Sequence, residues 1–158
     1  MKTSEIETAL KKQHNFLGVY PRDLLPKFVD DCLLICNTDV SKDPGEHWVA
    51  IKIKNDIGEY FDPFGLPPLH SEIMNFLGRN CSLWCYNTVP VQGVLSTNCG
   101  LFCVAFVQYC GNDWSLSSFL NKFSTHTQFN DKIVKKLVKK NSKLLFSYHG
   151  RVLRLFRN

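Results

Sequence analysis

The chain has 158 residues, of which 44% are hydrophobic, and its formal net charge is +5 at pH 7. A chain of this length can bury one hydrophobic core, so we expect a single domain over residues 1–158. No apolar run approaches the roughly 18 residues that a membrane span requires, and the first residues, MKTSEIETALKKQH, lack the apolar stretch of a signal peptide. We therefore expect a protein that is not secreted, has no membrane partner, and folds in the cytoplasm or nucleus.

The seven cysteines indicate thiols rather than a disulfide framework. Compartments that contain glutathione and thioredoxin keep most thiols reduced, and an odd number of cysteines cannot pair completely within one chain. The C-x2-C and histidine pairs of ordinary zinc modules are absent from the sequence. We expect neither a metal ion nor a small-molecule cofactor.

The first half of the chain contains the predicted strands. Residues 4–13 have the pattern of a short capped helix, and residues 18–27 interrupt it with two prolines. Residues 28–37 end in an apolar run of strand length, and residues 47–54 alternate apolar side chains with lysines. A third strand at residues 59–62 follows a short hairpin turn, so these three segments are expected to form an antiparallel meander.

The second half of the chain is predicted to be mainly helical. Residues 99–110, CGLFCVAFVQYC, are almost wholly apolar and of helical length, which predicts a buried central helix. The sum is an α+β fold in which a small antiparallel sheet packs against that helix. The other expected elements are a strand in residues 81–89 and helices at residues 69–78, 117–123 and 131–140, whereas residues 144–156 have no assignable structure.

Positive charge is concentrated at the C-terminal end, in an expected basic helical region over residues 129–158. From residue 131 onward there are nine lysines or arginines and a single acid. Such clustering favours a polyanionic partner such as nucleic acid, although a solvated helix face would have the same composition. The lysines that would contact DNA are Lys132, Lys135, Lys136, Lys139, Lys140 and Lys143.

Cys99 is the candidate nucleophile. A cysteine in the first turn of a helix lies where free amide groups and the helix dipole favour negative charge, and this stabilises its thiolate. The preceding polar loop would let the sulfur face a cleft, and Gly100 would leave room there for a substrate backbone. Cys103 and Cys110 lie deeper along the same helix and are most simply buried small hydrophobic residues.

Three further residues have the chemistry that a thiol nucleophile requires. A thiolate works best beside an imidazole, and His47 begins a strand directly after a flexible turn. Asp62 ends the strand predicted to pair with that of His47, so its carboxylate could hold the imidazole in one tautomer. Gln92, seven residues before Cys99, could contribute an amide to an oxyanion hole. Each residue taken alone also has an ordinary structural explanation.

The order of these residues resembles the adenovirus protease (adenain) family. The stretches GEHWVAI, EYFDPFG and VQGVLSTNCGLFC resemble the His, acidic, Gln and Cys motifs of that family in order and spacing. The resemblance implies an architecture like that of papain and the SUMO-specific peptidases, with Cys99 as nucleophile and His47 as general base. It further implies Asp62 as the orienting acid and Gln92 as the oxyanion-hole amide, and it places Trp48 beside the site.

The resemblance also implies a biological role. Family members are cysteine endopeptidases that mature virion precursor proteins by cutting at Gly-containing sequences, typically with a short viral peptide and DNA as activators. The resemblance thus implies that the substrates are viral precursor polypeptides. It also implies a protein that is made late in infection, is a monomer, and is located in the virion and the host nucleus. A disulfide to an activating peptide would fall on Cys81, which precedes Gln92 at a similar distance, with Cys85 as a competitor. Similar proteases occur in adenovirus-like mobile elements, so the chain could come from a virus or from such an element.

Two other functions remain open on the sequence. A peptidase specific for ubiquitin-like modifiers belongs to the same clan, although such enzymes usually have a docking surface for which this chain has little room. A catalytically inert nucleic-acid-binding virion protein would also account for the basic tail. The presence of all four motif residues argues against this second alternative.

Overall fold

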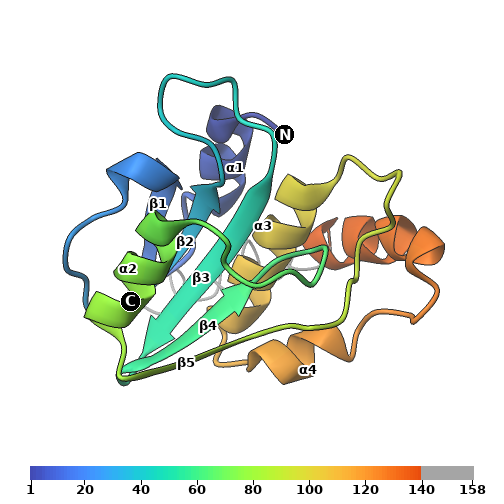
Figure 1. Ribbon diagram of the computed structural model, residues 1–158. Helices are drawn as coiled ribbons and strands as arrows, with labels where there is room; N and C mark the ends of the chain where they lie inside the picture. Colours follow the sequence, from blue (N-terminus) through green and yellow to red (C-terminus); the bar gives the residue numbers. More distant parts are fainter. Residues whose placement is uncertain (140–158) are drawn as a thin grey trace, which may run out of the picture.

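The structure, a computed structural model that describes residues 1–139, is a five-stranded sheet with helices on both faces (Figure 1). The strands lie in the order in which they occur in the chain. They are β1 (Phe16–Pro21), β2 (Cys32–Asn37), β3 (Trp48–Lys54), β4 (Ile57–Phe61) and β5 (Leu83–Tyr86). The predicted α+β class is confirmed.

The antiparallel prediction holds for the three central strands, whereas the two outer strands run parallel to their neighbours. The sheet as a whole is therefore mixed. Strand β1, which was not predicted from the sequence, includes part of the segment whose prolines were expected to interrupt the first helix. Pro21 is the last residue of this edge strand, a position where the missing N–H of proline is tolerated.

A two-residue turn joins β3 to β4. Its residues, Asn55 and Asp56, have positive φ angles of 50° and 65°, which asparagine and aspartate adopt more readily than most side chains. Two central residues with positive φ form the tight turn that matches the twist of a hairpin, so the turn sets Lys54 opposite Ile57. The rest of the register follows as far as Ala50 opposite Phe61.

The helices pack in two layers, one on each face of the sheet. Helix α3 begins and ends as predicted, and it lies on one face with α1 and α4, whereas α2 covers the other face (Figure 1). The buried side chains accordingly form two core clusters separated by the sheet. The helices are α1 (Thr3–Leu10), α2 (Ser71–Asn80), α3 (Cys99–Cys110) and α4 (Leu116–Leu120), with short 3-10 turns at Arg22–Leu24 and Thr127–Phe129.

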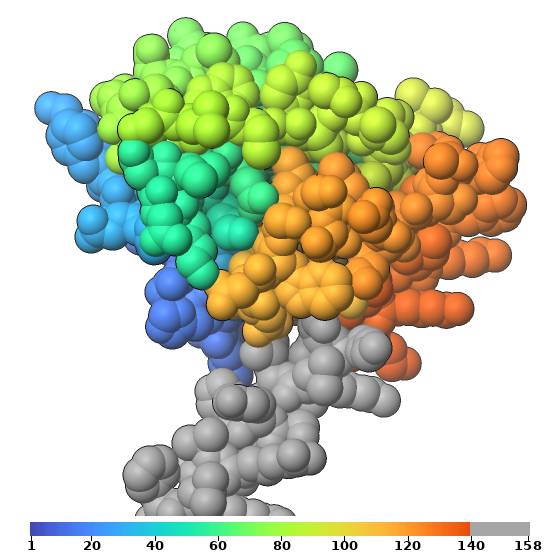
Figure 2. All heavy atoms as spheres, turned by 90° about the horizontal axis from the view of Figure 1, so that it is seen from below, coloured from blue at the N-terminus to red at the C-terminus, as the bar shows by residue number. Residues whose placement is uncertain are grey.

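Residues 130–139 are also helical and form the described part of the basic region. Figure 2 shows them in orange-red at one side of the molecule, next to the yellow-green segment that precedes α3. Val134 is fully buried in the core, so the helix is anchored by one face. The remainder of the predicted basic region, including residues 144–156, lies outside the described residues. Within residues 1–139, no helix is both long enough and apolar enough to span a membrane.

Three phenylalanine rings fill the core between α3, α4 and the sheet. The ring of Phe106 stacks on Phe61 with centroids 5.1 Å apart, and the edge of Phe119 meets both rings. All three side chains are fully buried. This cluster holds the buried helix against β4, and thus fixes the position of the helix that begins at Cys99.

We expect Phe106→Ala to lower the free energy of unfolding by about 3–5 kcal/mol, because it removes buried contacts and leaves a cavity. Urea unfolding followed by circular dichroism measures this loss. The matched control is Phe28→Ala, in which the same side chain is removed from a position that is 68% exposed. A loss at Phe106 as small as that at Phe28 would contradict the role of the cluster.

Candidate active site

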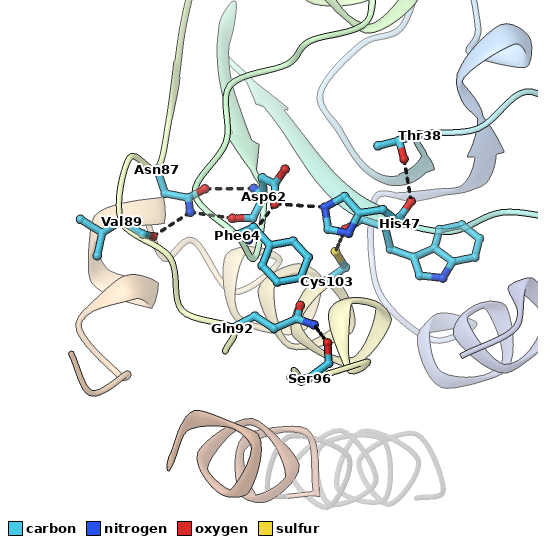
Figure 3. Close-up of polar contacts among 10 residues, drawn as sticks. Thr38, His47, Asp62, Phe64, Asn87, Val89, Gln92, Ser96 and Cys103 are labelled. Atoms are coloured by element: carbon cyan, nitrogen blue, oxygen red, sulfur yellow. Dashed lines mark hydrogen bonds and ion pairs between the residues drawn. The ribbon is translucent and has the colours of Figure 1, made fainter. Parts of the chain in front are cut away.

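The β3–β4 hairpin brings His47 and Asp62 to the same end of the sheet. His47 directly precedes β3 and Asp62 directly follows β4, and these strands are antiparallel. The imidazole Nε2 of His47 lies 3.0 Å from Oδ1 of Asp62 (Figure 3). Asp62 is buried, whereas the His47 side chain keeps 19% of its surface exposed. The ring can thus meet both a buried carboxylate and an incoming substrate.

Cys99 lies at the start of α3, against the same end of the sheet. Its thiol lies close enough to His47, and to the backbone N–H groups of Trp48 and Gly100, for these groups to lower its pKa. Because Asp62 occupies Nε2, Nδ1 is the ring nitrogen that remains for the thiol. Phe64 stacks on the other side of the imidazole with centroids 5.1 Å apart, which restricts the rotation of the ring.

The charges of the thiol and the imidazole stabilise each other. Burial by itself would raise the pKa of the Cys99 thiol, but the hydrogen bonds from His47 and the two backbone groups outweigh it and hold the pKa below its usual range. Burial would likewise lower the pKa of His47, but hydrogen bonds to Asp62 and Cys99 raise it to about 9. These opposite shifts favour the form of the pair in which the thiol has lost its proton to the imidazole.

Gln92 lies in the loop that leads to Cys99 and is almost fully buried. Its Nε2 donates to the carbonyl oxygen of Ser96 over 2.6 Å, whereas its Oε1 has no partner among the described residues (Figure 3). The backbone N–H groups of Val91 and Gln92 both donate to the carbonyl oxygen of Pro63. The loop is thus tied to the residue that follows Asp62.

The first residues of helix 130–139 hold the same loop from its other side. Asn130 is fully buried, and its Nδ2 donates to the carbonyl oxygen of Val91 over 2.9 Å. The hydroxyl of Ser96 donates to Asp131 over 2.8 Å. The position of Gln92 therefore depends on contacts with two segments that are remote in sequence.

Sequence reasoning missed Asn87, which has the most extensive contacts with Asp62. This buried asparagine follows β5 and forms hydrogen bonds with both backbone groups of Asp62 (Figure 3). The dipeptide Asn87-Thr88 has no motif that would single it out. Only its place beside the end of β4 identifies it.

The two residues assigned to the substrate cleft both pack against the start of the chain. Trp48 is buried, and its indole N–H donates to the carbonyl oxygen of Met1 over 3.2 Å. A Cβ atom at Gly100 would lie 3.0 Å from the Cβ of Met1 and 3.1 Å from the Cδ1 of Trp48. The structure therefore gives a packing reason for glycine at this position, and the cleft role of Gly100 stays a prediction.

The candidate peptide-coupling cysteines differ in exposure. Cys81 is buried, and its sulfur would lie 2.7 Å from a Cβ atom added at Gly58, whereas Cys85 is exposed on the edge strand β5. All seven cysteines lie within the described residues and none forms a disulfide there. Residues 1–139 contain no group of three or more side chains that could hold a metal ion.

The lysines predicted to contact DNA can be placed as far as residue 139. Lys132, Lys135, Lys136 and Lys139 are exposed, opposite the buried Val134. Spacings of three and four residues put them on one side of the helix. Lys140 and Lys143 lie outside the described residues.

A cysteine beside an imidazole that a carboxylate holds is the arrangement that cysteine-dependent hydrolases use. In agreement, the sequence model of the adenovirus endoprotease family matches residues 16–158. The chain therefore belongs to the adenovirus endoprotease family of cysteine peptidases.

Two solved structures of the ASFV pS273R protease, one of them with selenomethionine, are similar to this chain. The identities are 20% and 19%, and the TM-scores are 0.49 and 0.47. Each match covers 68% of this chain, and the shares of the viral protease covered are 43% and 42%. This chain thus spans less than half the length of that protease. No match was found among curated proteins.

We expect Cys99 to react with iodoacetamide faster than Cys85 just below neutral pH, although Cys85 is the more exposed thiol. The reason is that the pKa of Cys99 is lowered, whereas burial raises the pKa of Cys85. Mass spectrometry of tryptic peptides gives the rate at each cysteine. His47→Ala should slow only Cys99, because it removes the positive charge and hydrogen bond that stabilise the thiolate. A Cys99 rate that does not respond to this variant would contradict the pairing.

Proposed function

We propose that this protein is a cysteine endopeptidase that cleaves viral precursor polypeptides at Gly-containing sites during virion maturation. The observation that carries the proposal is that Cys99, at the start of α3, lies beside His47, whose ring is held by the buried carboxylate of Asp62 over 3.0 Å. The pKa of Cys99 is lowered and that of His47 is raised, which favours the charged form of the pair. Membership of the adenovirus endoprotease family supports the reaction class. The choice of precursor polypeptides and Gly-containing sites rests on the resemblance of the motifs to those of that family.

The arrangement suits attack on a peptide carbonyl. The Cys99 thiolate adds to the carbonyl carbon, and the negative charge moves to the carbonyl oxygen. The backbone N–H of Cys99 and the Nε2 of Gln92 stabilise that oxygen, because only one of the two amide hydrogens of Gln92 is needed by Ser96. The imidazolium of His47 then gives its proton to the leaving amine, which leaves the acyl group on the sulfur.

Hydrolysis of the acyl group returns the enzyme to its starting state. Neutral His47 takes a proton from a water molecule, whose oxygen attacks the thioester carbonyl. The carbon–sulfur bond breaks and the thiolate is released beside the imidazolium. Asp62 holds the Nε2 proton throughout, so that Nδ1 is always the nitrogen that faces the reacting atoms.

We expect Cys99→Ala to abolish cleavage of a Gly-x-Gly-Gly-type peptide while the protein stays folded. The matched control is Cys110→Ala, which makes the same change at the other end of α3 and should retain activity. A fluorogenic peptide gives the rate, and circular dichroism gives the fold. Wild-type turnover by Cys99→Ala would end the assignment of the nucleophile.

In the wild-type protein, activity should depend on pH in a bell-shaped manner. On the acid side it falls as the Cys99 thiolate is protonated, at a pH below the usual range for a thiol. On the alkaline side it falls above about 9, where His47 loses the proton that the leaving amine requires. A parallel assay with a ubiquitin-like conjugate tests the alternative substrate class.

Two activators are part of the proposal. The stripe of exposed lysines on helix 130–139 suits contact with the phosphates of DNA, and this supports a location in the virion and the host nucleus. A peptide that adds to edge strand β5 would reach Cys85 more easily than Cys81, because only Cys85 is exposed. Exposure thus favours Cys85 as the thiol for a mixed disulfide.

We expect Lys135→Ala and Lys136→Ala each to weaken binding of duplex DNA and to reduce the slope of log Kd against log salt by about one. Fluorescence anisotropy at several salt concentrations measures both quantities. Lys42→Ala removes an exposed lysine from the loop between β2 and β3 and serves as the control. If the helix variants behave like Lys42→Ala, DNA does not bind to this stripe.

A further inference from the structure

Asn87 occupies the point where the β4–β5 ladder ends. The two strands pair in parallel up to Tyr60 opposite Tyr86, and β4 ends one residue later at Phe61. Beyond that point the side chain of Asn87 replaces the backbone of a partner strand. Its Oδ1 accepts from the Asp62 N–H over 3.0 Å, and its Nδ2 donates to the Asp62 carbonyl oxygen over 2.7 Å.

These two hydrogen bonds fix the backbone from which the Asp62 carboxylate projects. The carboxylate Oδ1 accepts from the backbone N–H of Phe64 over 2.7 Å and lies 3.0 Å from the imidazole of His47. The Asp62 carbonyl oxygen also accepts from Gly65, whose φ is +73°. A rotation of the Asp62 backbone would therefore move the oxygen away from the imidazole, because the side chain has only two rotatable bonds.

Asn87 also fixes the segment that leads to Gln92. Its Nδ2 donates to the carbonyl oxygen of Val89 over 3.1 Å, and the backbone N–H groups of Val91 and Gln92 follow with bonds to Pro63. One buried amide thus contacts the carboxylate side and the Gln92 side of the site together. Among the described residues, the hydrogen-bonding atoms of its side chain are all satisfied.

We propose that Asn87 is a positioning residue, which keeps the Asp62 carboxylate against His47 and thereby keeps the His47 ring in place beside Cys99. The proposal rests on the proposed function only in the roles of Asp62, His47 and Cys99. A positioning role differs from a purely structural role, because Asn87 would then affect the protonation of His47 and Cys99, which its side chain does not contact.

The direction of that effect follows from the contacts. Asp62 stabilises the charged imidazole, so a displaced carboxylate lets the pKa of His47 fall from about 9. A less charged imidazole stabilises the thiolate less, so the pKa of Cys99 rises. The charged pair exists between the pKa of Cys99 and the pKa of His47, so this pH range becomes narrower at both its lower and its upper limit.

The test compares Asn87→Ala with Asn80→Ala. Asn80 is a close match, because its side chain also makes three hydrogen bonds to backbone groups, with Val29, Lys27 and Phe76. It lies at the end of α2, outside the candidate site. The rate of iodoacetamide reaction at Cys99 is measured against pH by mass spectrometry, alongside kcat/KM for the peptide and thermal unfolding.

In Asn87→Ala we expect the Cys99 reaction to titrate at higher pH than in the wild type, and kcat to fall by roughly tenfold to a hundredfold with little change in KM. In Asn80→Ala the unfolding temperature should fall by a similar amount, but the Cys99 titration should stay at its wild-type pH. Asn87→Gln keeps a neutral amide but displaces it by one methylene, so it provides a second variant if Asn87→Ala does not fold. It should shift the titration in the same direction.

An unchanged Cys99 titration in both folded Asn87 variants would overturn the inference, whatever the loss of stability. This outcome is distinct from failure of the proposed function. If the wild-type protein cleaves no peptide and yet Cys99 titrates at low pH in a manner that depends on Asn87, the positioning role stands and the endopeptidase proposal falls.

Discussion

The register of the β3–β4 hairpin is the constraint on which the site depends. Asn55 and Asp56 adopt the positive φ angles that a two-residue turn requires, and the turn sets every pair along the two strands. His47 and Asp62 extend from the open end of this hairpin. The turn at the closed end sets the register, and the register determines whether the two side chains meet. A slip of one residue would turn the Asp62 side chain to the opposite face of the sheet.

The site also requires that the first turn of α3 stabilise negative charge on a buried sulfur. The cysteines of α3 show how local this requirement is. Burial raises the pKa of Cys110 to about 12 and raises that of Cys103 as well, whereas Cys99 is shifted in the opposite direction. One pKa unit corresponds to about 1.4 kcal/mol, so the donors around Cys99 outweigh a substantial cost of burial. The difference comes from those donors, because the residue type and the helix are the same.

Side-chain amides complete the site where regular structure ends. Asn87 continues the β4–β5 ladder past its last backbone pair, and Asn130 holds the carbonyl oxygen of Val91 in the loop before α3. Both asparagines are buried, so their hydrogen bonds are shielded from competition with water. These hydrogen bonds hold the loop that contains Gln92 at both ends of its first half, which suits a group that must meet a developing charge.

The sequence by itself determined the α+β class, the three central strands and the bounds of the buried helix. These features follow from local patterns: alternation along 47–54, a short polar turn, and an apolar run of helical length. The choice of His47, Asp62 and Cys99 came instead from the order and spacing of the family motifs, and their catalytic roles stay predictions. Only the tertiary structure decided the parallel pairing of β1 and β5, the role of Asn87, the packing at Gly100, and which of Cys81 and Cys85 is exposed. The physical reason is that each of these depends on contacts between segments far apart in the chain, as with Asp62 and Asn87, 25 residues apart.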